Sequence, residues 1–311
     1  MLEVRRYTAE QQGEWNSFIA TAKNGTFLFD RNYMDYHSDR FSDHSLMFYR
    51  DDSLYAVLPA NEKEHTLYTH QGLTYGGLVM GTDATTVHVI EIFKMMNSYL
   101  REHSIQRVVY KAIPWIYHIV PAEEPLYAMH LTCRYHLLER DASSTVVLSK
   151  QLKWKKDRRH GLRVARDNEV RVDFSDDYTS FWSILIENLH VNHNVSPVHS
   201  LDEILLLNRR FPKNILFVGA WKDEELLGGC VVYVTPQVVH TQYIAATPMG
   251  KQLGVVNAII DKILSSFPEH LYMDFGKSTE AHSDILNENL IYQKEGFGAR
   301  TLCYDTYEWT L

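Results

Sequence analysis

The sequence has few of the features that mark secreted, metal-binding or membrane-spanning proteins. Only three cysteines occur in 311 residues, and the spacing of Cys133, Cys230 and Cys303 fits neither a disulfide framework nor a metal knuckle. No apolar run approaches the roughly 20 residues that a helix needs to span a bilayer. The opening segment, MLEVRRYTAEQQGEW, lacks the apolar stretch of a signal peptide. We therefore expect a cytoplasmic protein without a membrane span.

The composition is that of an ordinary globular protein with one unusual segment. Hydrophobic residues make up 45% of the chain and charged residues 23%, and the length predicts roughly two domains. The net charge is −8, but the segment from Lys150 to Arg171 carries nine Lys or Arg against three acids. This segment is therefore +6, and the remainder is −14. One cationic segment on an acidic protein indicates a local anionic partner rather than general nucleic-acid binding.

The order of predicted elements repeats between the two halves of the chain. Each half contains two helices, a hairpin around an acidic turn, a third strand, a helix and a further strand. Leu46 and Leu216 begin equivalent strands, and Val108 and Tyr272 form a second equivalent pair. The repeat predicts a duplicated α/β domain, with the first domain over residues 1–148 and the second over residues 149–311.

The stretch from His270 to Arg300 combines features of a reaction centre. A short apolar strand ends at Asp274-Phe275-Gly276, and Lys294 follows in a segment that reads as a glycine-bounded turn. Strand ends and turns place side chains where substrates bind. The same pattern also fits a buried strand with a capping turn and a surface lysine.

The motifs in this order resemble those of the Fem family of aminoacyltransferases. The resemblance is carried by Thr74–Gly77, the basic segment, Ser196–Ser200 and Tyr272–Phe297. It implies a mixed α/β fold of two tandem GNAT-like (acetyltransferase-like) domains. In such domains the central strands splay apart, and the acyl donor inserts there with its phosphates over a helix N-terminus.

The resemblance assigns catalytic roles to Lys294 and Asp274. A lysine at this position can pair with a donor phosphate or stabilise the oxyanion of the tetrahedral intermediate. Gln293 stands where the family often has Phe. Asp274 can accept a proton from the attacking amine, or it can cap backbone amides at the strand end. Gly276 would let a ligand approach the backbone closely.

Three further residues are candidates for the acceptor site. Tyr243 lies midway along the preceding strand, where a core tyrosine is the alternative. His193 and His199 lie in a histidine-containing segment that can form a loop beside the site. The histidine spacing does not match a zinc signature, and no cysteine or carboxylate completes a site nearby, so we predict no metal.

The basic segment is the first of two places predicted to bind the donor. Arg158, Arg159 and Arg163 can contact the phosphates of a tRNA. The alternative is a solvated helix that links the two halves.

The second place is the segment from Lys251 to Val256, which corresponds to the pyrophosphate signature of acyl-CoA enzymes. Lys251 replaces the first Gln or Arg of that signature, and Gly254 is present. Val256 replaces the final Gly or Ala, and its branched side chain crowds the amides that should face the pyrophosphate. The sequence therefore disfavours acyl-CoA as the donor.

These features predict an acyl- or aminoacyltransferase that forms an amide bond on an amine of a small molecule or a cell-envelope precursor. The acceptor and the oligomeric state are not specified by the sequence. The donor is expected to be aminoacyl-tRNA or acyl-CoA, with no tightly bound cofactor. Two alternatives stay open: a catalytically idle binding protein, and a plain acetyl-CoA-dependent N-acetyltransferase.

Overall fold

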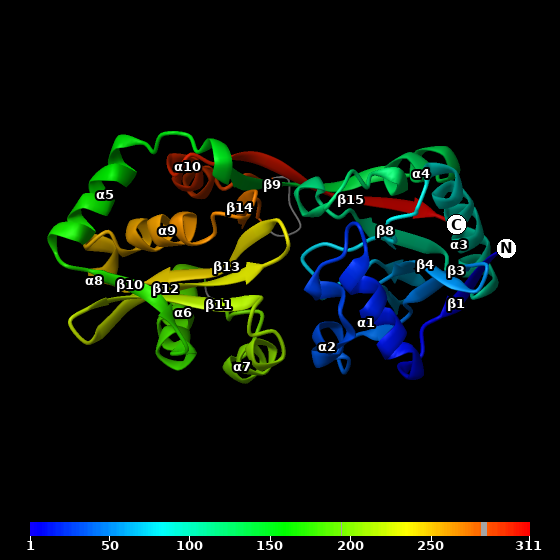
Figure 1. Cartoon of the computed structure of the whole chain (residues 1–311), viewed down its shortest axis with the longest axis horizontal. Helices are drawn as coiled ribbons and strands as arrows, with labels where there is room; N and C mark the ends of the chain where they lie inside the picture. Colours follow the sequence, from blue (N-terminus) through cyan, green and yellow to red (C-terminus); the bar gives the residue numbers. More distant parts are fainter. Residues whose placement is uncertain (194, 281–284) are drawn as a thin grey trace. The chain divides into compact units, whose positions relative to one another are not determined.

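The computed structural model describes residues 1–193, 195–280 and 285–311, with side chains for all of these except residues 192 and 193. The chain forms two compact units, whose elements are labelled in Figure 1. Unit 1 contains Met1–Asp141 and Cys303–Leu311, and unit 2 contains Ala142–Glu280 and Ile285–Leu302.

Unit 1 contains a small antiparallel sheet, a second group of paired strands, and several helices. Its α-helices are α1 (Gln12–Thr21), α2 (Arg31–Met34), α3 (Thr86–Glu102) and α4 (Glu124–Thr132). Its strands are β1 (Leu2–Arg6), β2 (Ser42–Asp43), β3 (Leu46–Arg50), β4 (Ser53–Leu58), β5 (Asn61–Lys63), β6 (Thr66–Tyr68), β7 (Val79–Met80) and β8 (Arg107–Lys111). Strands β1, β3, β4 and β7 form one sheet. In the second group, β6 runs parallel to β8 and antiparallel to β5.

The core of unit 1 forms around α3. The apolar residues of this helix recur at the spacing of one helical face, and that face is buried. Its buried members are Val89, Ile92, Phe93, Met96 and Leu100. The amphipathic helix predicted from this spacing is therefore confirmed.

Unit 2 contains a longer sheet with helices on both faces. Its α-helices are α5 (Lys156–Asp167), α6 (Tyr178–His193), α7 (Leu201–Arg210), α8 (Pro248–Gln252), α9 (Val255–Ser266) and α10 (Glu288–Gly296). Its strands are β10 (Arg171–Ser175), β11 (Ile215–Lys222), β12 (Glu225–Val234), β13 (Val238–Ala246) and β14 (Tyr272–Lys277). Neighbouring strands are antiparallel from β10 to β13, and β13 then runs parallel to β14.

The two faces of the unit 2 sheet are covered by different helices. Val255, Ile259 and Ile263 of α9 pack on one face with Met273 and Val239 of the strands. On the other face, aromatic side chains of α6 contact β11 and β13, through ring pairs of Phe181 with Phe217 and of Trp182 with Tyr243. Helix α7 begins with the predicted capping box, in which Ser200 and Glu203 exchange hydrogen bonds.

Two long strands contain residues of both units. Strand β9 (His136–Val147) pairs with β14, and β15 (Arg300–Thr310) pairs with β8 over Thr306–Thr310. The first unit thus ends near Asp141 rather than at residue 148, and it regains the last residues of the chain. The last residues of the chain belong to unit 1 because Trp309 lies in the unit 1 core. This side chain is 2% exposed and donates from Nε1 to Asn97 Oδ1 at 3.2 Å.

We predict that Trp309→Ala lowers the free energy of unfolding by about 3–5 kcal/mol, because it removes a large side chain from a packed core. Urea denaturation followed by circular dichroism measures this loss. The matched control is Trp115→Ala, since Trp115 is 51% exposed and its substitution should change stability by less than about 0.5 kcal/mol. Equal losses in the two variants would contradict the assignment of Trp309 to the core.

Candidate functional site

The parallel pairing of β13 and β14 stops in the middle of both strands. Only Val238–His240 pair with Tyr272–Asp274, although β13 continues to Ala246 and β14 to Lys277. The last paired residues are His240 and Asp274. Strand β13 also has an irregularity at this level, because its register with β12 shifts between Val231 and Val232. The two strands of unit 2 therefore splay apart just beyond His240 and Asp274.

Asp274 is a fully buried carboxylate whose oxygens accept hydrogen bonds from two neighbouring strands. Ser143 Oγ and Thr145 Oγ1 of β9 donate to Oδ1 at 2.7 and 3.0 Å. Nδ1 of His240 lies 2.8 Å from Oδ2. Burying a carboxylate is costly unless donors surround it. The side chain of Asp274 is 0% exposed, so solvent does not reach its oxygens.

The end of β14 is kinked where the strands separate. Gly276 has φ +75°, a left-handed conformation that side-chain-bearing residues rarely adopt. The register of β14 with β9 shifts between Asp274 and Lys277. A Cβ atom at position 276 would lie 3.1 Å from Cε1 of His240. The glycine therefore leaves the space that the imidazole ring of His240 fills.

Lys294 holds this kink from α10. The sequence predicts a turn at this lysine, but the residue lies in the last turn of the helix and is buried. Its Nζ donates to the carbonyl oxygens of Gly276 and Lys277 at 2.8 and 2.7 Å, and to Ser278 Oγ at 2.9 Å. Burial lowers the pKa of the Lys294 ammonium to about 8, against an opposing contribution from Asp274. Its three donors are used within unit 2.

Tyr243 lies farther along β13 and is engaged by the segment before α7. Its Oη accepts a hydrogen bond from the backbone N–H of His199 and lies 2.5 Å from His199 Nδ1. Burial raises the pKa of Tyr243 to about 12. The predicted pair of Tyr243 and His199 thus comes together. The third candidate, His193, ends α6, and its side chain lies outside the described residues.

Helix α5 covers the start of α9, where the pyrophosphate turn is predicted. Gly254 caps α9 with φ +69°, and a Cβ atom there would lie 2.1 Å from the carbonyl oxygen of Gly161. Asn257 Nδ2 donates to the Arg158 carbonyl oxygen at 2.9 Å. Gly254, Val255 and Asn257 are buried. A phosphate binds a helix start through accessible N–H groups, and α5 occupies that position.

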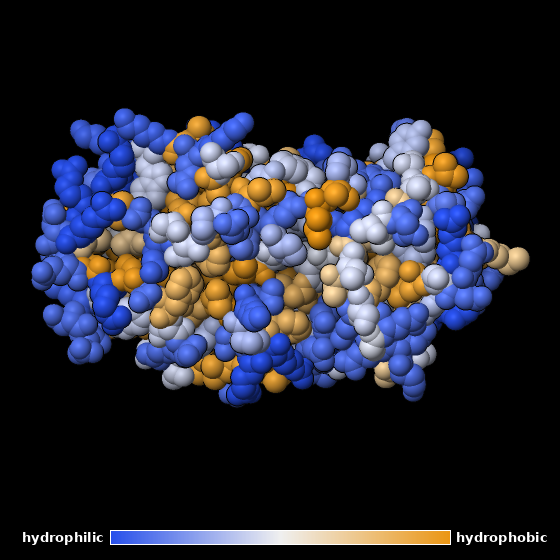
Figure 2. Space-filling model, in the orientation of Figure 1, coloured by the Kyte–Doolittle hydropathy of each residue, from blue (hydrophilic) through white to orange (hydrophobic). Residues whose placement is uncertain are grey.

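The outer surface of α5 is strongly cationic. Arg159 and Arg163 are exposed, whereas Arg158 is half-buried with its guanidinium over the ring of Phe297. Figure 2 shows hydrophilic residues gathered over α5. Lys251, in α8, is also exposed. The first turn of α5 borders an open hollow of about 550 Å³ whose lining residues are Lys155, Lys156, Asp157, His160 and Tyr292.

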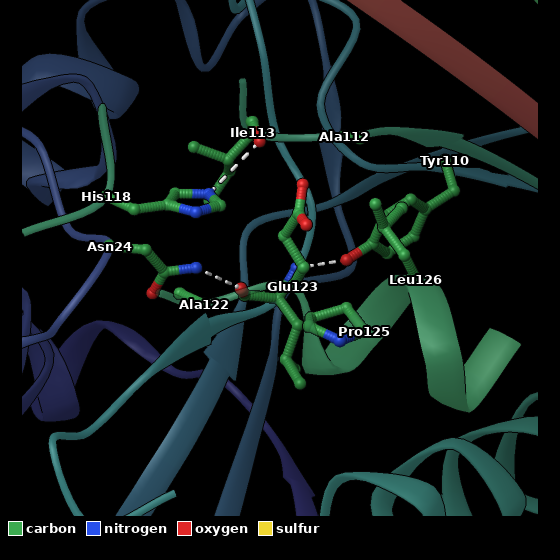
Figure 3. Close-up of a pocket in the computed structure, with 10 residues that line it drawn as sticks. Asn24, Tyr110, Ala112, Ile113, His118, Ala122, Glu123, Pro125 and Leu126 are labelled. Atoms are coloured by element: carbon green, nitrogen blue, oxygen red, sulfur yellow. Dashed lines mark hydrogen bonds between the residues drawn. The ribbon is translucent and has the colours of Figure 1, made fainter. Parts of the chain in front are cut away.

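Unit 1 contains a small polar cavity that is too small for a substrate. Its volume of about 20 Å³ holds roughly one water molecule. Figure 3 shows three of its polar side chains hydrogen-bonded to backbone: Asn24 Nδ2 donates to the Leu78 carbonyl, Tyr110 Oη accepts from the Leu78 N–H, and His118 Nε2 lies 3.2 Å from the Ile113 carbonyl oxygen. Burial lowers the pKa of His118 to about 4, so this imidazole is neutral near pH 7. We assign the cavity a structural role.

Comparison with known proteins gives structural matches only. No family model matches the sequence, and no curated protein matches it. The crystal structure of FemX matches with a TM-score of 0.70 at 9% identity, over 99% of this chain and 97% of that chain. The C-terminal domain of a putative lysylphosphatidylglycerol synthetase from Agrobacterium fabrum matches with a TM-score of 0.61 at 10% identity, over 97% and 92%.

A tandem GNAT protein from the clavulanic acid biosynthesis pathway also matches, with a TM-score of 0.52 at 11% identity, over 100% of this chain and 98% of that chain. This chain shares its fold with FemX and with this tandem GNAT protein. The mixed α/β fold of two GNAT-like domains that the sequence predicts is confirmed. At these identities the likeness shows the fold alone.

Within the tandem GNAT fold, the structure brings together some predicted site residues and adds one. Asp274, Gly276 and Lys294 meet at the kink of β14, and His240 joins them there. His240 is absent from the prediction because it lies in the run VVHTQYIAA, which has no recognisable motif. Among the described residues, no cluster of His, Cys, Asp and Glu could hold a metal ion. No described helix is both long enough and apolar enough to cross a membrane.

We predict that Lys294→Met lowers the free energy of unfolding by about 1–3 kcal/mol, because three acceptors at the kink lose this donor. The pH dependence gives a second signature. The folded-state pKa, about 8, is below the ordinary value of 10.5, so the unfolded chain binds more protons between these values. The contribution of Lys294 to stability therefore rises with pH across that window.

Chemical denaturation of wild type and Lys294→Met at pH 7, 8, 9 and 10 isolates this contribution from other titrating groups. The difference between the two proteins should widen above pH 8. Lys277→Met is the matched control, because Lys277 is exposed at the same kink and should show no widening. A difference that stays constant or narrows would mean that Lys294 is not the buried group with the lowered pKa.

Proposed function

We propose that this protein is an acyltransferase that joins a donor acyl group to an amine of a small molecule or a cell-envelope precursor, with an aminoacyl ester as the donor. The observation that carries the proposal is the splay of β13 and β14 directly beyond His240 and Asp274. The splay leaves the β14-facing edge of β13 unpaired with β14 from Thr241 to Ala246. The N–H and C=O groups of such an edge can bind the aminoacyl end of a donor while its carbonyl lies beside ionisable side chains.

The names of proteins with the same fold support acyl chemistry. One is a putative lysylphosphatidylglycerol synthetase, and another is a tandem GNAT protein whose structure was determined without acetyl-CoA. A fold hosts many functions. The proposal therefore depends on the site of this chain and takes only its general direction from these names.

The arrangement of α5 and α9 favours an aminoacyl ester over acyl-CoA. Gly161 of α5 contacts Gly254 at the start of α9, and this contact fills the place of a pyrophosphate. The predicted effect of Val256 is secondary, because Val256 packs against the unit 2 core. The exposed Arg159 and Arg163 on the outer face of α5 offer phosphate contacts of the kind that a tRNA requires.

We predict transfer from aminoacyl-tRNA and not from acetyl-CoA. The assay incubates the purified protein with a ¹⁴C-labelled aminoacyl-tRNA mixture or with [¹⁴C]acetyl-CoA. The acceptors are a panel of UDP-linked amino sugars and peptidoglycan precursors, and mass spectrometry identifies the products. Calorimetry with acetyl-CoA should give a dissociation constant no tighter than high micromolar, since α5 blocks the phosphate turn. Tight acetyl-CoA binding with acetyl transfer would instead make the protein an N-acetyltransferase, and no transfer from either donor would favour an idle binding protein.

We predict that Arg159→Glu with Arg163→Glu weakens tRNA binding and flattens its salt dependence. Each lost phosphate contact lowers the slope of log K against log salt by up to about one. Filter binding of aminoacyl-tRNA at several salt concentrations measures the slope. The matched control, Arg209→Glu with Lys213→Glu, makes the same change in net charge on exposed residues at the end of α7. Equal slopes for both double variants would identify α5 as a solvated helix.

A further inference from the structure

We infer that His240 is the general base that accepts the proton of the attacking amine, and that Asp274 positions it. This inference rests on the proposed acyl transfer. It assigns the proton transfer to a residue that the sequence does not single out, and it changes the role expected for Asp274. The geometry that supports it is the contact between His240 Nδ1 and Asp274 Oδ2 at the point where the strands separate.

The hydrogen bond to Asp274 selects the tautomer of His240. An ionised carboxylate only accepts hydrogen bonds, so the proton of a neutral imidazole lies on Nδ1, 2.8 Å from Oδ2. Nε2 is then left with its lone pair, as a base requires. The hydroxyl groups of Ser143 and Thr145 donate to the other oxygen of Asp274. These hydrogen bonds hold the carboxylate in place, and the carboxylate in turn orients the imidazole ring of His240.

His240 reaches solvent, whereas Asp274 does not. The side chain of His240 is 11% exposed, and that of Asp274 is 0% exposed. A Cβ atom at Gly276 would lie 3.1 Å from Cε1, closer than most Cβ contacts in proteins, so the glycine allows the ring to keep this position. A base must come within hydrogen-bond reach of the proton it removes, and of these two residues only His240 can do so.

Lys294 acts on this arrangement as a positioning residue. Its Nζ binds the carbonyl oxygens of Gly276 and Lys277 and thereby holds the kink that gives His240 its space. His240, Asp274 and Lys294 are ionisable side chains that form hydrogen bonds at the kink. The oxyanion role predicted for Lys294 would require it to leave at least one of these acceptors.

The reaction balances with these groups alone. The amine nitrogen attacks the carbonyl carbon of the aminoacyl ester, a C–N bond forms, and Nε2 takes the amine proton. The tetrahedral intermediate then breaks its C–O bond, and the imidazolium returns the proton to the departing ribose oxygen. The products are an amide and a free hydroxyl group, and no oxidant, reductant or metal is consumed.

The first test compares His240→Asn with wild type in the aminoacyl-tRNA transfer assay. The asparagine amide can still donate to Asp274 but cannot act as a base. We predict that kcat/KM falls about 10²- to 10³-fold, within the range for removal of a general base. The ratio of wild-type to variant kcat/KM should decrease toward acid pH, because only an unprotonated base accepts a proton. Ionisation of the acceptor amine affects both proteins equally and cancels in this ratio.

Two further variants separate positioning from folding. Asp274→Asn should lower kcat/KM by a similar factor, because the amide can donate to Nδ1 and stabilise the wrong tautomer. The second variant, Thr145→Val, should lower kcat/KM by less than tenfold, since Ser143 still donates to Asp274. The control His190→Asn changes an exposed histidine of α6 and should leave activity unchanged. Denaturation curves confirm that each variant is folded.

A measurement that does not use activity tests the tautomer directly. Long-range ¹H–¹⁵N NMR of the full chain near pH 8, with His240→Asn for assignment, should show a neutral His240 with its proton on Nδ1. A proton on Nε2 in the wild type would overturn the inference whatever the activity. If the His240→Asn variant keeps the wild-type rate and pH profile, the inference about His240 is wrong, whereas the proposed function still holds. A wild type that transfers nothing from either donor overturns the proposed function and the catalytic role with it.

Discussion

The buried carboxylate of Asp274 is the constraint on which unit 2 depends. A charge without solvent must receive hydrogen bonds from its surroundings. Ser143 and Thr145 supply them from β9, and His240 supplies one from β13. These contacts hold three strands in one register at the level where β13 and β14 stop pairing. The same requirement that stabilises this point of the sheet also orients the imidazole that we propose as the base.

The contact between α5 and α9 determines which surfaces of these two helices are accessible. Two glycines make this contact possible, because a Cβ atom on Gly161 would collide with Asn257 and one on Gly254 would collide with Gly161. The close approach buries the start of α9 and leaves Arg159 and Arg163 of α5 exposed. Helix α5 therefore has one face packed against α9 and a cationic outer face.

Much of the fold could be predicted from the sequence, because it depends on local patterns. The apolar stripes of α3 and α9 and the capping box of α7 each occupy a short stretch of chain. The return of β15 to unit 1 could not be predicted, since it depends on Trp309 meeting Asn97 of α3. In the site, Asp274 is recognisable from the run Asp274-Phe275-Gly276, although it lies inside β14 rather than at the strand end that the sequence predicts. His240 is not, because its partner lies 34 residues away and no motif marks the pair.

The parallel strand pairs of the two units differ in the residues at which the pairing ends, and this difference bears on function. In unit 1, β6 and β8 pair from Thr66–Arg107 to Tyr68–Val109, so the last pair contains no carboxylate and no imidazole. Lys111 Nζ then binds the carbonyl oxygens of His70, Gln71 and Leu73 and fixes the chain beyond β6 as a loop. In unit 2, Lys294 instead binds backbone carbonyls at the end of β14, and β13 continues past the splay. A lysine thus binds backbone carbonyls beyond the parallel pairing in both units, but only the last pair of unit 2 joins an imidazole to a carboxylate.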